Sequence, residues 1–145
     1  MILNGVIESV EMHRSPSDEP VSALDVNVRI TDVRDIGGNL EATFLYEVNY
    51  EKDLGLLRMS GRLLVAPPSK EAKNDVLGAW AQGQSTPIGF SQEVINAAYH
   101  LCTINSVLVS RIVNISPPIP PLKIDLTKGI QPSAGAMPSR KQKKK

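Results

Sequence analysis

Apolar and polar residues alternate along three stretches in the first half of the chain. These are residues 24–31 (LDVNVRIT), 40–50 (LEATFLYEVNY) and 57–65 (LRMSGRLLV). In the first of them, one face would carry Leu24, Val26, Val28 and Ile30. A period of two is typical of strands that are buried on one face, so each stretch predicts a strand. The opening residues 2–12 (ILNGVIESVEM) predict a fourth strand with a less regular pattern.

The links between these strands favour an antiparallel sheet. Residues 35–39 (DIGGN) contain Gly37 and Gly38, which tolerate positive φ and suit a hairpin. Residues 51–55 (EKDLG) form an equally short link. Neither link has room for the helical crossover that parallel strands require. The first link, 13–22 (HRSPSDEPVS), is longer and polar, and it could carry the chain across the sheet.

The period of the apolar residues changes to that of a helix after residue 68. Ser69 is a suitable N-cap for a short helix over 70–83 (KEAKNDVLGAWAQG). Ser91 is then a suitable N-cap for a long helix over 92–115. Strands followed by helices predict an α+β fold class, with a four-stranded antiparallel sheet and a short and a long C-terminal helix on one face.

The long predicted helix is apolar around most of its circumference. Its main stripe consists of Val94, Ala97, Ala98, Leu101, Ile104, Leu108, Ile112 and Ile115. The residues that broaden this stripe are Tyr99, Cys102, Val107, Val109 and Val113. A helix of this kind is buried on more than one side. We therefore expect either a second subunit or another piece of the same chain to cover it.

The segment that follows the helix, 114–126 (NISPPIPPLKIDL), combines four prolines with large aliphatic residues. Proline fixes its own φ, lacks an amide donor and biases the preceding residue toward extended conformations, so these prolines end the helix. Its apolar residues Ile119, Leu122, Ile124 and Leu126 make the segment too apolar for a solvated linker.

The length and charge of the chain indicate one folded domain with a basic tail. The chain has 145 residues and a net charge of +1, enough length for a single core. We assign residues 1–126 to the domain and 127–145 to a disordered tail. The positive residues of this tail's last seven positions are Arg140, Lys141, Lys143, Lys144 and Lys145. The rest of the chain therefore carries a net charge of +1 − 5 = −4. The tail is either a solubilising end or a weak contact to RNA, ribosomes or anionic lipid.

The sequence offers few candidates for chemistry. The histidines are His13 and His100, and the one cysteine is Cys102, so neither a metal site, a cofactor nor a catalytic triad is predicted. Glycine-rich phosphate-binding loops are also missing from the pattern. The amino-terminal stretch lacks the basic start of a signal peptide and carries Glu8 and Glu11. Apolar runs do not reach the ~20 residues of a membrane helix. We expect a non-enzymatic, cytoplasmic protein.

Several of these stretches together resemble the SecB family of export chaperones, and look closest to the SecB-like proteins of archaea. The similarity rests on LDVNVRITDV, FLYEVNY and LLRMSGRLLV, and on the polar, proline-containing first link. It also rests on the helix INAAYHLCTINSVLVSRI, which runs into PPIPPLKI. It spans roughly residues 1–126.

The resemblance implies a chaperone that holds client chains unfolded for export or folding. In SecB-like proteins, sheets and long helices build a dimer that pairs into a tetramer, and apolar grooves bind unfolded polypeptides. The groove residues that the resemblance implies here are Val26, Val28, Tyr99, Val107, Ile119, Leu122 and Ile124. Bacterial members often reach the translocation motor through a zinc-binding tail, but the tail here has neither cysteine nor histidine. A strict export role is therefore less expected, and some relatives act instead in toxin–antitoxin systems.

A second hypothesis assigns the same apolar surface to one folded partner. The chain would then be an interaction or adaptor subunit of an assembly associated with ribosomes or nucleic acid, and the basic tail would contribute to that association. Loss of cellular association on deletion of residues 139–145, with client binding retained, would favour this hypothesis.

Overall fold

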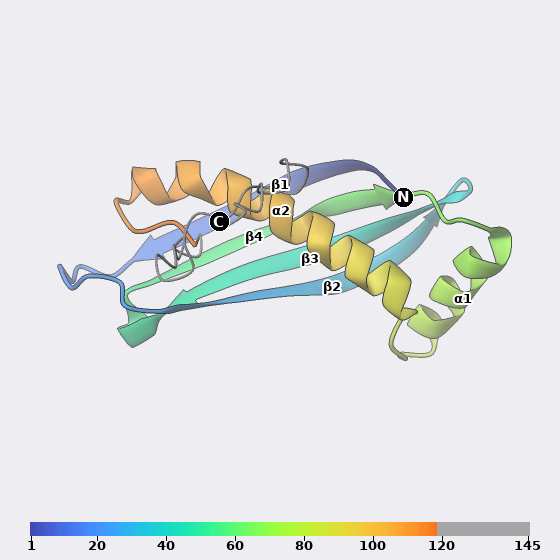
Figure 1. The fold of residues 1–145 in the computed structure, drawn as a ribbon, viewed down its shortest axis with the longest axis horizontal. Helices are drawn as coiled ribbons and strands as arrows, with labels where there is room; N and C mark the ends of the chain where they lie inside the picture. Colours follow the sequence, from blue (N-terminus) through green and yellow to red (C-terminus); the bar gives the residue numbers. More distant parts are fainter. Residues whose placement is uncertain (119–145) are drawn as a thin grey trace, which may run out of the picture.

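The computed structural model describes residues 1–118, which form four antiparallel strands and two helices (Figure 1). The strands are β1 (Ile2–Arg14), β2 (Leu24–Ile36), β3 (Asn39–Tyr50) and β4 (Gly55–Val65). The helices are α1 (Lys70–Ala81) and α2 (Ile88–Ile112), and a short 3-10 turn over Glu51–Asp53 joins β3 to β4. The expected α+β class with a four-stranded antiparallel sheet is confirmed. The predicted boundary at residue 126 and the basic tail lie outside the described residues.

The order of the strands in the sheet is β1-β4-β3-β2, so the first and second strands of the chain form its two edges. The link after β1 therefore crosses from one edge to the other, as its length allowed. The other two links join neighbours, and Gly37 and Gly38 adopt φ of 53° and 98° in the β2–β3 turn. α2 crosses one face of the sheet, whereas α1 packs at the end of the strands (Figure 1).

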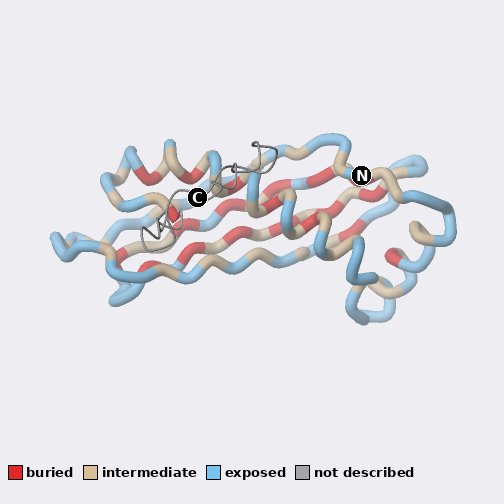
Figure 2. Tube along the Cα trace, viewed as in Figure 1, coloured by how far each residue is buried: buried red, intermediate tan, exposed pale blue. Residues whose placement is uncertain are grey.

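The period-two pattern of the sequence corresponds to a single buried face. Alternate residues of β3 are buried, from Leu40 through Phe44 and Tyr46 to Tyr50. Figure 2 shows that buried positions concentrate on β3 and β4, the two central strands. β2 alternates between half-buried and exposed residues over Leu24–Ile30, as an edge strand does when its apolar face lies over a core.

α2 approaches the sheet through small side chains. The buried residues of α2 are Val94, Ala98, Cys102, Ser106 and Ser110, spaced four apart. The large residues Ile104, Leu108 and Ile112 instead lie on the outer side, with exposed fractions of 70%, 65% and 82%. We call these three residues the α2 outer ridge. The sequence pattern had placed them in one stripe with Val94 and Ala98, and this was wrong because the pattern weighs hydrophobicity and takes no account of size.

The ends of the helices follow the sequence in one case and depart from it in the other. The Ser69 hydroxyl caps α1 by accepting a hydrogen bond from the Ala72 amide at 3.1 Å, as expected. α2 begins earlier than expected, at Ile88, with Pro87 at the N-cap position. Ser91 therefore does not cap α2, and its side chain contacts the Thr86 hydroxyl instead.

Two glycines should respond in opposite directions to alanine. A methyl group on Gly61 would collide with the Val6 carbonyl and lie 2.9 Å from Phe44 Cζ, so G61A should destabilise the fold by about 2 kcal/mol or more. Gly78 lies inside α1, and a methyl group there meets no atom within 4 Å. G78A should therefore stabilise by roughly 0.5–1 kcal/mol. Urea unfolding of both variants checks this, and equal midpoints would contradict it.

Candidate functional site

α2 runs diagonally across the sheet. It begins over β2 and β3 and ends beside β1 (Figure 1). Near its middle, the Tyr99 ring lies 6.4 Å from the Tyr46 ring on β3, measured between centroids. Further along, the Arg14 guanidinium at the end of β1 donates to the Val113 carbonyl at 3.0 Å. The first half of β2 therefore lies on the side that α2 moves away from.

Two of the expected groove residues lie on this part of β2. Val28 pairs with Tyr46 and Val26 with Val48 in the register of β2 and β3. Leu24, Val26 and Val28 are half-buried and pack against the core cluster. We call these three residues the β2 row. They form an apolar border at the edge of the sheet, next to the buried β3 residues Tyr46, Val48 and Tyr50.

The other expected groove residues differ in how close they come to the β2 row. Tyr99 contacts the same tyrosine that Val28 opposes, so the structure brings Val28 and Tyr99 to one place. Val107 lies two turns further along α2 and is half-buried. The described cavities at the two ends of the sheet are not lined by any of these four residues. Ile119, Leu122 and Ile124 lie outside the described residues.

The tyrosines beneath the site are hydrogen-bonded and remain protonated at neutral pH. The Tyr46 hydroxyl lies 3.2 Å from Thr103 Oγ1 on α2, and the Tyr50 hydroxyl donates to the Ser116 carbonyl at 2.8 Å. Burial is the main cause that raises the pKa of both phenols above the usual value near 10. The Tyr46 hydroxyl thus links α2 to the sheet, and the Tyr50 hydroxyl links the segment after α2 to it. Their raised pKa values do not suit acid–base chemistry near neutral pH.

The chain turns back onto the sheet directly after α2. Asn114 has φ of 53°, in the left-handed region that commonly follows a helix, and the Ile115 amide donates to the Ser110 carbonyl at 3.0 Å. Ile115 then packs near Gly55 and the Tyr50 ring. Pro118 is fully buried. The beginning of the proline-rich segment is therefore part of the folded domain.

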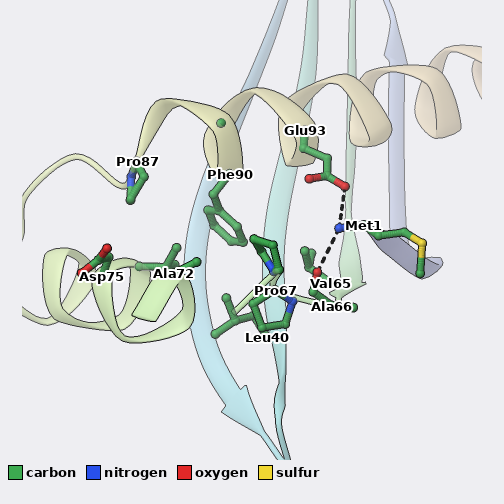
Figure 3. Close-up of a pocket in the computed structure, with 13 residues that line it drawn as sticks. Met1, Leu40, Val65, Ala66, Pro67, Ala72, Asp75, Pro87, Phe90 and Glu93 are labelled. Carbon is green, nitrogen blue, oxygen red and sulfur yellow. Dashed lines mark hydrogen bonds and ion pairs between the residues drawn. The ribbon is translucent and has the colours of Figure 1, made fainter. Parts of the chain in front are cut away.

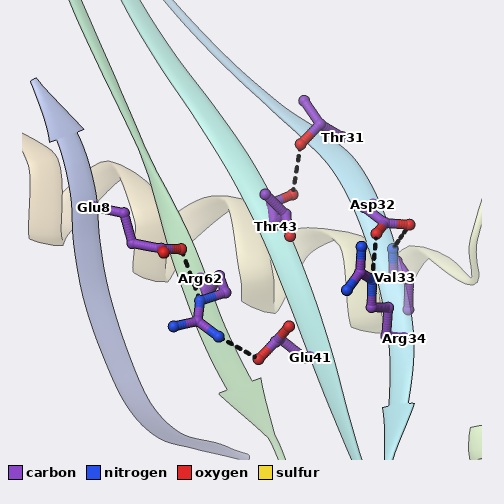
Figure 4. A network of polar contacts seen from close by, with 8 residues as sticks. All are labelled: Glu8, Thr31, Asp32, Val33, Arg34, Glu41, Thr43 and Arg62. Atoms are coloured by element: carbon purple, nitrogen blue, oxygen red, sulfur yellow. Dashed lines mark hydrogen bonds and ion pairs between the residues drawn. The ribbon is translucent and has the colours of Figure 1, made fainter. Parts of the chain in front are cut away.

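The two edges of the sheet differ in how much apolar surface they expose. On β1, Glu8 binds Arg62 of β4 at 2.7 Å (Figure 4), so its charge is directed toward the sheet. The exposed apolar residues of β1 are Leu3, Val6 and Val10, with exposed fractions of 44% to 49%. On β2, Arg34 binds Asp32 of its own strand at 2.8 Å (Figure 4), which keeps both charges at the edge. β1 carries a pair of the same kind, Glu11 with His13 at 2.8 Å, so charge does not distinguish the two edges. β1 is the less protected edge because it exposes more apolar surface.

A cavity of about 370 Å³ lies at the far end of the sheet, between α1 and the start of α2 (Figure 3). Its walls are mostly apolar, with Leu40, Pro67 and Phe90 prominent among them. The Glu93 carboxylate borders it and lies 2.9 Å from the Met1 nitrogen. Sequence reasoning missed this cavity because its walls come from four separate segments. Its size suits one apolar side chain or a small apolar molecule.

The candidates for chemistry found in the sequence are separated in space. Within residues 1–118, no group of three or more His, Cys, Asp and Glu residues is placed to hold a metal ion. His13 lies 2.8 Å from Glu11, and this contact lowers the pKa of the Glu11 carboxyl. His100 is exposed on α2, with its ring 5.9 Å from that of Tyr99.

Cys102 is a buried residue of the α2–sheet contact. Burial raises the pKa of its thiol to about 12. The folded state thus favours the neutral thiol. This contribution to stability is present at neutral pH and is lost as the pH rises from the free-thiol value of ~8.5 toward 12.

Comparison of the chain with protein-family models, with curated proteins and with solved structures gave no match. The likeness to SecB therefore stays a hypothesis that rests on the residue patterns. Among the described residues, neither helix combines the length and apolar character needed to cross a bilayer.

The Cys102 thiol should be unreactive while the protein is folded. At pH 8, alkylation by iodoacetamide should be at least about a hundredfold slower than for an unstructured cysteine, because the thiolate is scarce and access needs opening of the fold. The same thiol should react at the ordinary rate in guanidinium chloride. Mass spectrometry of both samples checks this, and rapid native alkylation would show that α2 does not seal this position.

Proposed function

We propose that the chain is a non-enzymatic, SecB-like chaperone of the cytoplasm that holds unfolded or extended polypeptides on apolar surface. The observation that carries this proposal is that apolar side chains on the helix side of the molecule form two separate strips, of which the α2 outer ridge is the more exposed. Soluble chains seldom leave contiguous apolar surface without a binding role. The half-buried β2 row offers a second apolar strip on the same side of the sheet.

The β2 row and the neighbouring side of α2 are the parts that we assign to client binding. Val26 and Val28 of β2 and Tyr99 and Val107 of α2 supply aliphatic and aromatic contact area without charge. Apolar contacts of this kind discriminate little between sequences, which suits many different unfolded clients. The assignment of Ile119, Leu122 and Ile124 to client binding rests on the resemblance to SecB-like proteins.

We assign the α2 outer ridge to a second copy of the chain in a homo-oligomer. Ile104, Leu108 and Ile112 are spaced four apart and form one inclined ridge on the helix surface, so two such helices can pack with the same residues on both sides of a two-fold axis. The less protected β1 edge supports the same conclusion, since pairing with another strand would satisfy its free backbone groups.

One folded partner is the alternative occupant of the α2 outer ridge. Residues at positions i, i+4 and i+8 of a rigid helix are also the pattern with which a helix enters the groove of a single partner. Under this alternative the chain is an adaptor subunit, and its basic tail at 140–145 would contact nucleic acid or a ribosome.

Client holding can be measured as suppression of the aggregation of a chemically denatured model protein. The wild-type chain should suppress aggregation at stoichiometric amounts. V26D should weaken binding of a permanently unfolded client by about tenfold, because it places a charge in the apolar strip. N27D is the matched control on the opposite face of β2, and it should bind as the wild type does. Failure of the wild type to suppress aggregation would refute the chaperone proposal.

Self-association can be measured as solution mass by analytical ultracentrifugation. The wild-type chain should sediment as a dimer or tetramer. L108K should shift it toward the monomer, because a charge at the centre of a helix–helix contact cannot be solvated there. N96K changes an exposed polar residue of the same helix and should leave the mass unchanged. A wild-type monomer would favour the adaptor alternative.

A further inference from the structure

We infer that the cavity between α1 and the start of α2 is a binding site for a small cationic amphiphile. Such a molecule joins an apolar body of the size of naphthalene to a primary ammonium group. The site is separate from the β2 row and from the α2 outer ridge. The inference therefore goes beyond the proposed chaperone function and does not depend on it.

The volume of the cavity sets the size of the apolar body. This volume is about 370 Å³, whereas an apolar cavity of about 150 Å³ in a protein core already holds benzene. A naphthalene-sized body therefore fits, with room for a short arm that carries the head group. The cavity also admits an apolar side chain of another protein, but a phenylalanine ring would leave more than half of it empty.

The walls of the cavity are apolar on each element that contributes to it (Figure 3). β3 and β4 supply Leu40 and Val65, α1 supplies Ala72 and Val76, and α2 supplies Phe90. Leu40, Val65 and Val76 are also part of the buried core, so this part of the wall is held in place without a ligand. Transfer of an apolar body from water to such walls is favourable.

The ionisable side chains at the cavity are both carboxylates. Figure 3 shows Asp75 of α1 and Glu93 of α2 at opposite ends, with the Phe90 ring between them. Glu93 is already paired, since its Oε1 lies 2.9 Å from the Met1 nitrogen. Asp75 has no ion-pair partner among residues 1–118. Asp75 is therefore the group that we assign to the ammonium of the ligand.

The surroundings of Asp75 leave its charge uncompensated. Glu71 precedes it by one turn of α1, and like charges at this spacing repel one another. Lys73 is close in sequence, but its ammonium binds Asp35 of β2 at 2.7 Å. An ammonium group beside Asp75 would relieve this repulsion, while the apolar body occupies the space between α1 and Phe90.

An anionic ligand suits the cavity less well. The start of α2 would offer it amide groups, because Pro87 at the N-cap position provides no side-chain cap. However, Glu93 and Asp75 border the same cavity, so an anion at these amides would meet like charge.

An occupant of the cavity would tighten the attachment of α1. Val76 is the one buried residue of this helix, so α1 has little core contact of its own. A ligand that contacts α1, α2 and the end of the sheet adds to that contact. Because it binds only the folded chain, it should also raise the temperature of unfolding.

Three probes with one apolar body and different head groups test the inference on the full chain. They are naphthylethylamine, naphthylethanol and naphthylacetate. At neutral pH the amine is protonated and the acid is ionised. The amine should bind with a submillimolar Kd and shift the amide NMR signals of Ala72, Val76 and Phe90. The alcohol should bind about fivefold more weakly and the acid more weakly still, because the head group meets a partly exposed carboxylate.

Four variants separate the role of the charge from that of the volume. D75N should lower the affinity for the amine to that for the alcohol, and should leave the affinity for the alcohol unchanged. E71Q is the matched control on the same helix, outside the cavity wall, and it should retain the preference for the amine. A72L should abolish binding of the amine and the alcohol by filling the cavity from α1. G89L fills it from α2, where a methyl group on Gly89 meets no atom within 4 Å, and it replaces A72L if that variant does not fold.

Several results would overturn the inference. Equal affinities of the wild type for the amine and the alcohol, or tighter binding of the acid, would refute a cationic ligand. A loss of preference in E71Q as large as in D75N would refute the role of Asp75. Absence of saturable binding of the amine, or shifts that centre on the α2 outer ridge, would refute the site itself. The chaperone proposal is tested separately, by the suppression of aggregation.

Discussion

The close approach of α2 to the sheet through small side chains is the constraint on which the surface of this molecule depends. Ala98, Cys102 and Ser106 are fully buried against the sheet, and their small volumes let the helix axis lie near the strands. Large residues on that side would hold the helix away and leave voids. Three large aliphatic residues of α2, Ile104, Leu108 and Ile112, lie on the opposite side, and this outer ridge is a consequence of how the core is packed.

The diagonal course of α2 adds a second consequence. A straight helix across a twisted four-stranded sheet covers a band and leaves two corners. At one corner α1 and the start of α2 enclose the cavity beside Leu40 and Phe90 (Figure 3). At the other corner the chain itself returns over Gly55 and Tyr50. The described chain after α2 thus returns to the sheet at this corner.

The polar face of the sheet has a different role. Arg62 bridges Glu8 of β1 and Glu41 of β3, with N–O distances of 2.7 and 3.1 Å (Figure 4). Hydrogen bonding to Glu8 is the main cause that raises the pKa of the Arg62 guanidinium. Such exposed pairs add little to stability, but this one directs the Glu8 carboxylate of β1 toward the sheet.

The sequence by itself determined the elements, because each depends on local chemistry. Alternation over 40–50 specifies a strand with one buried face, Gly37 and Gly38 specify a tight turn, and Ser69 specifies the start of α1. Only the tertiary structure decided that β1 and β2 are the two edges of the sheet. It also decided which side of α2 faces the strands. A helix with apolar residues on all sides has several faces of similar hydrophobicity, so hydropathy cannot choose among them. The choice depends on volume, since only the small-residue side of α2 fits the space above the strands.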